Sequence, residues 1–197
     1  MYIEDLYLKN FRNYDSLDVS FSGEYNVIYG ANAQGKTNIL EAVFLCATGR
    51  SHRTYRDSEM IRHAQDALKV ALSVEKKNRG KIKIEVDINS AGKKSVRINE
   101  IPIKRMGDLM GYLNVVIFTP EDVRITKEEP QVRRRVLDMF ISQIKPAYFF
   151  NLQQYIKVLR QRNALLRQIK DNEKLLGTLD AWNEALVAPG VRIMKER

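Results

Sequence analysis

Residues 30–37 constrain the fold of this chain more than any other segment. They read Gly-Ala-Asn-Ala-Gln-Gly-Lys-Thr and fit the pattern G-x-x-x-x-G-K-[ST]. An apolar run at residues 25–29 comes before them, and residues 37–48 have the apolar spacing of a helix that stops at Gly49. A buried strand that turns through glycines into a helix is the context in which this pattern binds phosphate. The sequence therefore predicts an α/β fold of the P-loop nucleotide-binding class.

Each residue type in this loop meets a chemical requirement of phosphate binding. Glycine lets the backbone wrap closely, so that successive N–H groups point inward as donors. We expect Lys36 to reach the β and γ phosphates, Thr37 to offer its hydroxyl to Mg²⁺, and the following helix to present its positive end to the anion. The predicted nucleotide-binding residues are Gly30, Ala31, Asn32, Ala33, Gln34, Gly35, Lys36 and Thr37.

The basic residues are unevenly distributed. The 197-residue chain has a formal net charge of +9. Residues 1–49 have a net charge of −3, whereas residues 124–170 carry 11 basic and 3 acidic side chains. This asymmetry favours duplex DNA as a partner, although a solvated basic face would have the same composition. The candidate DNA contacts are Arg50, Arg53, Arg56, Arg133, Arg134 and Arg135.

Both arginine groups leave alternatives open. Residues 50–56 follow the predicted helix and would face either the adenine base or DNA, or form a surface loop. The triplet at residues 133–135 begins a second predicted helix, where adjacent cations are unfavourable unless an anion lies nearby. DNA phosphate and an acidic protein patch both fit that description, and solvent alone is the third alternative.

Apolar periodicity divides the rest of the chain into a β-rich part and a helical part. Half-buried strands are predicted at residues 2–8, 17–21, 68–74, 81–88 and 95–99. The apolar runs at residues 25–29 and 115–118 predict strands buried on both faces, as in a parallel sheet. Helices are predicted at residues 131–144 and 148–170, with a returning helix from residue 179. We expect a head lobe over residues 1–120 and a helical arm over residues 121–197.

No catalytic residue is predicted. Nucleotide hydrolysis needs a carboxylate at the end of a second strand, but Thr119 and Pro120 follow the run at residues 115–118. Glu85 and Asp87 alternate with apolar residues in a predicted strand, so we expect them to face solvent.

Cysteine and histidine usage indicates neither disulfides nor a metal site. The single cysteine, Cys46, favours a reducing compartment and is expected in the core. His52 and His63 are too sparse for a metal site. No apolar run approaches the ~20 residues that span a bilayer, so a cytoplasmic location without membrane contact is predicted.

Six segments together carry a family resemblance. They are L-K-N-F-R-N-Y at residues 8–14, the loop with N-I-L-E-A at 30–42, T-G-R-S-H-R-T at 48–54, F-T-P-E-D at 118–122, R-R-R-V-L-D at 133–138 and Y-I-K-V-L-R-Q-R-N at 155–163. With these motifs the whole chain resembles the N-terminal half of the RecF family, bacterial recombination-repair ATPases related to the SMC class.

The resemblance implies a fold, a ligand and partners. The fold is an ABC-type ATPase head lobe with an antiparallel β subdomain and a helical arm, and the cofactors are ATP and Mg²⁺. Arg12 and Asn13 would lie near the nucleotide. ATP would gate a homodimer that holds duplex DNA near single-strand gaps and junctions, and that acts with RecR and RecO to help load RecA.

The resemblance also implies that two motifs needed for hydrolysis lie outside this chain, and other functions stay open. Family members place the signature motif and the Walker B carboxylates in a C-terminal segment, so this chain alone is expected to hydrolyse ATP negligibly and to form no ATP-dependent dimer. A kinase that uses the same loop, another SMC-like DNA-binding ATPase, and a DNA-binding module with a vestigial loop are the alternatives.

Overall fold

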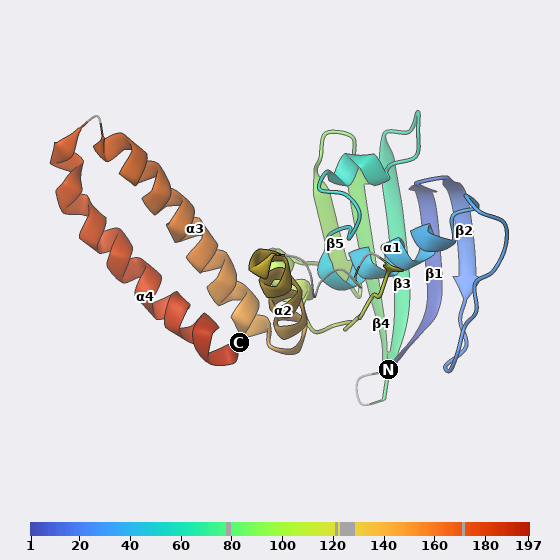
Figure 1. Cartoon of the computed structure of the whole chain (residues 1–197). Helices are drawn as coiled ribbons and strands as arrows, with labels where there is room; N and C mark the ends of the chain where they lie inside the picture. The colour runs from blue at the N-terminus through green and yellow to red at the C-terminus, as the bar shows by residue number, and fades with distance from the viewer. Residues whose placement is uncertain (78–79, 121, 123–128, 171) are drawn as a thin grey trace. The chain divides into compact units, whose positions relative to one another are not determined.

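The chain divides into two compact units, Met1–Phe118 and Thr119–Arg197. The computed structural model describes residues 1–77, 80–120, 122, 129–170 and 172–197 (Figure 1). In this described part, no helix is long and apolar enough to cross a membrane.

The first unit is built on a six-stranded sheet in which all neighbouring strands are antiparallel. The strand order is β2-β1-β3-β4-β5-β6. The strands are β1 (Tyr2–Phe11), β2 (Tyr14–Ser20), β3 (Ala67–Lys76), β4 (Gly80–Asn89), β5 (Lys94–Ile98) and β6 (Ile101–Pro102). The half-buried strands predicted from alternation are therefore confirmed, with shifts of a few residues at their ends.

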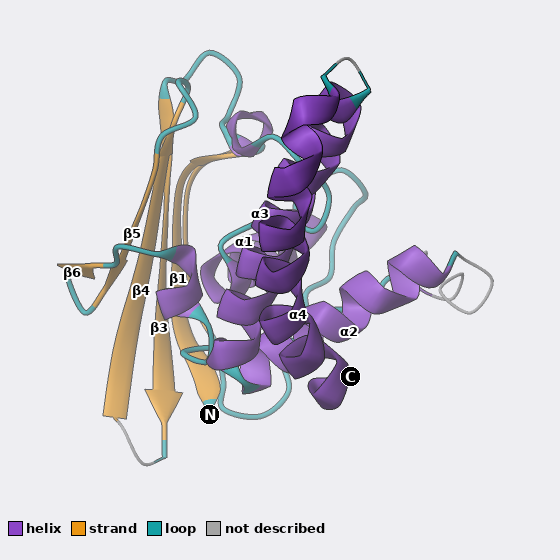
Figure 2. Cartoon of the chain, turned by 90° about the vertical axis from the view of Figure 1, so that its left-hand side faces the viewer, coloured by secondary structure: helices purple, strands orange, loops and turns teal. Residues whose placement is uncertain are grey.

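The helix α1 (Lys36–Thr48) covers one face of this sheet and contacts β1, β3 and β4 (Figure 2). Alternate strand residues such as Leu8, Leu72 and Ile84 are fully buried on that face. Burial of each such side chain contributes about 1.5–3 kcal/mol. From α1, Leu45 and Cys46 complete the core, which confirms the prediction for the cysteine. The strands and the helix therefore share one apolar layer.

Glycine is required where α1 ends. Gly49 has a φ of 71°, and its N–H donates to the carbonyl of Leu45 at 2.8 Å. A Cβ at this position would clash only with the terminal methyl group of Met106, the end of a flexible side chain that can move away. The predicted helix stop at Gly49 is therefore confirmed, and its cause is the left-handed backbone conformation.

The two predicted buried strands are wrong. Residues 25–29 and 115–118 belong to no strand. Tyr25 and Tyr29 are 93% and 88% exposed, and Val116 and Phe118 are also largely exposed. A buried strand needs a paired neighbour on each side, and the six-stranded sheet of the described residues includes neither run. An apolar run predicts burial only where the fold supplies such neighbours.

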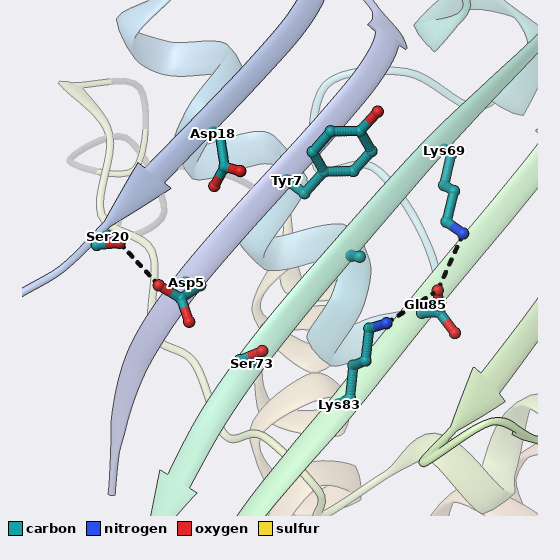
Figure 3. A pocket seen from close by; sticks show the side chains of 9 residues that line it. Asp5, Tyr7, Asp18, Ser20, Lys69, Ser73, Lys83 and Glu85 are labelled. Carbon is teal, nitrogen blue, oxygen red and sulfur yellow. Dashed lines mark hydrogen bonds and ion pairs between the residues drawn. The ribbon is translucent and has the colours of Figure 1, made fainter.

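The sheet face opposite α1 is polar (Figure 3). Glu85 lies on this face beside Lys69 Nζ at 3.0 Å, Lys83 Nζ at 3.6 Å and Arg97 Nε at 3.4 Å, and its side chain is only 7% exposed. The predicted solvent exposure of Glu85 is therefore wrong, because long cationic side chains fold over the carboxylate. Asp87 is half-buried and lies 2.9 Å from Arg97 Nη2.

The second unit is helical. It contains α2 (Pro130–Ile144), α3 (Pro146–Ile169), a short 3-10 helix (Glu173–Thr178) and α4 (Leu179–Glu196). α3 and α4 pack along each other as a hairpin, as Figure 1 shows. A proline stands at the start of both α2 and α3, where its missing N–H leaves no hydrogen bond unmade. The predicted helices are confirmed.

Polar contacts join the three helices of the second unit. The Arg162 Nε donates to Asn183 Oδ1 at 2.7 Å between α3 and α4. The guanidinium of Arg197 donates to both carboxylate oxygens of Asp138 at 2.8 Å, which ties the end of α4 to α2. The hydroxyl of Tyr148, at the start of α3, donates to the same carboxylate.

Candidate nucleotide-binding site

Gly35 is the point at which the predicted phosphate-binding loop becomes a helix. It is the N-cap of α1 and has a φ of 99°, in the left-handed region that favours glycine. A Cβ here would lie 2.6 Å from Asn13 Oδ1 and 2.8 Å from Tyr14 Oη. Glycine is thus required by conformation and by space, and the turn between β1 and β2 lies directly against the loop.

Lys36 closes the loop. Its ammonium group donates to the carbonyl oxygens of Gly30 at 2.8 Å and Ala31 at 2.6 Å. Residues 30–34 are exposed. The N–H groups in the first turn of α1 come before the regular hydrogen bonds of the helix backbone begin. No side chain caps this end of the helix. The structure therefore brings a cation and backbone donors to one exposed helix terminus, which is an arrangement that attracts an anion.

Thr37 is exposed in the first turn of α1. Among the described residues, no group of three or more His, Cys, Asp and Glu side chains is placed to hold a metal. Mg²⁺ usually keeps several waters and takes one or two protein ligands together with phosphate oxygens. One threonine hydroxyl at the helix terminus fits that requirement.

Arg12 contacts the helix that follows the loop. Its Nη2 is 2.6 Å from Glu41 Oε1 and its Nε is 3.0 Å from Glu41 Oε2, so the guanidinium and the carboxylate form a two-bond pair. Its Nη1 donates to the carbonyl of Glu59 at 2.7 Å. Arg12 has a φ of 54°, and its N–H donates to the carbonyl of Met60 at 2.8 Å. The structure therefore fixes both the side chain and the backbone of Arg12.

Glu41 also accepts hydrogen bonds from the segment that follows α1. The Ser51 hydroxyl donates to Oε1 at 2.5 Å, and Arg53 Nη1 lies 3.4 Å from Oε2. Arg53 Nη1 donates to Asn38 Oδ1 at 2.8 Å, and Asn38 Nδ2 donates to Asn13 Oδ1 at 2.8 Å. The predicted residues Arg12, Asn13 and Arg53 thus meet around the first turns of α1.

The carboxyl group of Glu41 is fully buried and charged. Burial disfavours its ionised form, but hydrogen bonds from Arg12 and Ser51, together with the charges of Arg12 and Arg53, outweigh that effect and lower its pKa. Sequence reasoning missed this residue. The available signal was an acidic side chain next to the core residue Ala42 and one turn before the core residue Leu45, because acidic residues are almost never fully buried unless paired.

The other predicted arginines are not gathered at this site. Arg50 and Arg56 are exposed, as is Tyr55 between Arg53 and Arg56. In the second unit, Arg133, Arg134 and Arg135 are exposed on α2. Glu121, in the motif at residues 118–122, lies outside the described residues.

Known proteins resemble this chain along its whole length. A family model described as an AAA domain matches residues 5–187. The DNA replication and repair protein RecF of Acetivibrio thermocellus is 52% identical over 197 residues, which are 100% of this chain and 53% of that protein. The protein of the same name from Bacillus cereus is 42% identical over 198 residues, covering 100% of this chain and 52% of that protein. The chain therefore spans about half the length of the curated relatives it matches.

Solved structures share the fold. A structure of the recombination mediator protein RecF with ATP, in the RecFOR pathway, matches with a TM-score of 0.94 and 39% identity, covering 98% of this chain and 52% of that one. An SMC ATPase structure matches with a TM-score of 0.60 and 23% identity, covering 71% of this chain and 99% of that one.

The class of protein follows from these matches and from the fold. A P-loop helix packed on an antiparallel β subdomain, with a helical arm, is an α/β ABC-type ATPase head of the kind found in RecF and SMC proteins. Within that class the chain belongs to the RecF family of DNA replication and repair proteins.

Proposed function

We propose that residues 30–37 bind the phosphates of ATP together with Mg²⁺. The observation that carries this proposal is the position of Lys36, whose ammonium group lies inside the loop at the exposed N-terminus of α1. Backbone N–H groups of the loop and of the first helical turn donate to phosphate oxygens, and Lys36 adds a point charge. The match to a RecF structure that contains ATP supports the same ligand.

Thr37, Arg12 and Asn13 complete the proposed site. The Thr37 hydroxyl is the protein ligand of Mg²⁺, which when bound supplies neutralisation of charge on the phosphate oxygens. Asn13 lies against Gly35, and its side chain accepts a hydrogen bond from Asn38 in the first turn of α1. Arg12 is the preceding residue and pairs with Glu41 of α1, and we place it in the proposed site next to Asn13.

We propose DNA as the partner of the arm. Residues 124–170 carry most of the surplus positive charge, and Arg134 and Arg135 are exposed on α2. In this proposal the head lobe, residues 1–120, binds the nucleotide, and the arm, residues 121–197, contributes cations to duplex DNA. The exposed residues Arg50 and Arg56 of the head are further candidates.

For a whole protein of the length of the named relatives, we propose an ATP-gated homodimer in the cytoplasm. It would hold duplex DNA next to single-strand gaps and act with RecR and RecO to help load RecA. The named relatives, and a RecF structure from the RecFOR pathway, support this role. The 197-residue chain by itself is proposed to bind ATP weakly and to hydrolyse it negligibly.

Isothermal titration with ATP and Mg²⁺ tests the nucleotide proposal on this chain. We expect measurable binding that Lys36→Ala removes, because the variant loses the side-chain cation seated in the loop. Lys77→Ala, at an exposed lysine beyond the end of β3, is the matched control and keeps the affinity. Equal ATP affinity in the wild type and Lys36→Ala would favour the DNA-binding module with a vestigial loop.

A further inference from the structure

The cluster around Glu41 holds two guanidinium groups on one buried carboxylate. The side chain of Glu41 is 0% exposed, that of Arg12 is 20% exposed and that of Arg53 is 46% exposed. Two cations this close repel each other, and a shared carboxylate offsets that repulsion. Without the negative charge, the more exposed Arg53 would turn to water.

Glu41 connects three segments that are distant in sequence. It holds Arg12 of the turn between β1 and β2, and Ser51 and Arg53 of the segment after α1. The hydroxyl of Ser51 accepts hydrogen bonds from the N–H groups of Arg53 and Thr54 at 2.9 and 3.1 Å, so the carboxylate also orders that backbone. The cluster is therefore a preorganised unit rather than a set of separate surface pairs.

The cluster faces the phosphate end of α1. Arg53 Nη1 donates to Asn38 Oδ1, two residues after Lys36, and Asn38 in turn bonds Asn13 against Gly35. The hydrogen bonds thus run from the buried carboxylate to Asn13, whose side chain lies beside Gly35 of the loop. A guanidinium held in this place meets an anion without first losing its side-chain freedom, which is the usual gain from preorganisation.

We infer that Glu41 is a positioning residue of the nucleotide site, which fixes Arg12 and Arg53 beside the phosphates while touching no phosphate itself. This inference rests on the proposed ATP binding and extends it. Its chemical consequence is that a neutral isostere at position 41 weakens nucleotide binding through the two arginines. Glu41→Gln keeps the shape of the side chain but loses the charge that holds the pair.

The test measures ATP affinity by titration of the full 197-residue chain. Glu41→Gln is expected to weaken binding about tenfold, the size of one lost charge-assisted hydrogen bond. Glu41→Asp keeps the charge on a shorter side chain, and its ATP affinity is expected to lie between that of the wild type and that of Glu41→Gln. Glu100→Gln, at an exposed glutamate after β5, is the matched control and keeps the wild-type affinity. Circular dichroism shows whether each variant is folded.

A double-mutant cycle separates positioning from general stability. Arg53→Ala leaves the two Arg12 bonds to Glu41 intact, so this variant is expected to fold even if Glu41→Gln does not, and to bind ATP several-fold more weakly. If Glu41 acts through Arg53, the losses of ATP affinity in Glu41→Gln and Arg53→Ala are not independent. The double variant then binds ATP only slightly more weakly than whichever single variant has the lower affinity. Losses that simply multiply would overturn the inference, as would wild-type affinity in Glu41→Gln or in Arg53→Ala.

Comparing the wild type with Lys36→Ala separates a failure of the proposed ATP binding from a failure of the positioning role of Glu41. If neither binds ATP, or both bind equally, the proposed function fails and the role of Glu41 fails with it. If Lys36→Ala loses binding but Glu41→Gln binds like the wild type, only the positioning role is wrong.

Discussion

Lys94 Nζ donates to the carbonyl of Gly49 at 2.6 Å and lies 2.6 Å from Asp57 Oδ2. Lys94 opens strand β5, whereas Gly49 ends α1 and Asp57 begins the 3-10 helix Asp57–Met60. One partly buried ammonium group therefore pins the segment after α1 at both ends. That segment carries Ser51 and Arg53, so its order bears on the candidate site.

Lys94→Met is expected to destabilise the chain by about 1–2 kcal/mol, because it removes two charge-assisted contacts that are largely shielded from water. Urea unfolding measures the destabilisation, and hydrogen exchange at residues 50–57 should accelerate in the variant. Lys93→Met changes an exposed neighbour on the same hairpin and should leave both measurements unchanged. Equal exchange in the two variants would show that Lys94 does not order this segment.

Gly35→Ala is expected to lower stability by about 2 kcal/mol or more, because a Cβ adds backbone strain and a steric clash with Asn13 and Tyr14. Gly92→Ala is the matched control. Gly92 has a φ of 78°, but open space surrounds the position of its Cβ, so that variant should show the strain alone. Thermal unfolding of both variants separates the two effects, and an equal loss of stability would show that the turn can move away from the loop.

Glu85 makes stability depend on pH. Burial disfavours its charge, but the hydrogen bond from Lys69 and the charges of Lys69, Lys83 and Arg97 lower its pKa on balance. A carboxyl whose pKa is lower in the folded state stabilises the fold above its unfolded pKa of about 4.3, and this contribution disappears as the pH falls through the lower folded pKa.

The corresponding variant is Glu85→Gln. Near pH 7 we expect it to be less stable than the wild type by about 1–2 kcal/mol, the value of a charge-assisted contact, and we expect the difference to shrink below about pH 4. Urea unfolding from pH 3 to pH 7 measures this, with Glu24→Gln at an exposed position as the control. A difference that stays constant with pH would mean that the charge of Glu85 contributes nothing.

Replacing Arg134 and Arg135 by Glu is expected to weaken binding to duplex DNA without changing sequence preference. The slope of log K against log salt should flatten by about one for each phosphate that the variant no longer neutralises. Fluorescence anisotropy at several salt concentrations measures the slope. The double change of Lys174 and Lys195 to Glu alters the net charge of the same unit by the same amount and serves as control. An unchanged slope in the arginine variant would assign the two residues a structural role.

Local sequence patterns predicted the elements whose environment is set by their own neighbours. Alternation in residues 81–88 predicted β4, because one face of that strand is covered by α1 and the other is polar. The continuous apolar run at residues 25–29 predicted a strand that does not form, because its apolar side chains have no neighbouring strand in the described sheet. Glu85 was misjudged because alternation identifies the face of a residue but not the cationic side chains that cover it.

The sequence by itself predicted a phosphate-binding loop at residues 30–37, and it determined the helix that follows, the end of that helix at Gly49 and the helices of the arm, because each depends on residues within a few positions of one another. Only the tertiary structure decided what surrounds the loop. Arg12, Glu41 and Arg53 are separated by up to 41 positions, yet they form one ion-paired cluster. Their meeting depends on how β1 and the segment after α1 pack against the helix, and the energy of pairing two arginines with a buried carboxylate arises only in that packed state.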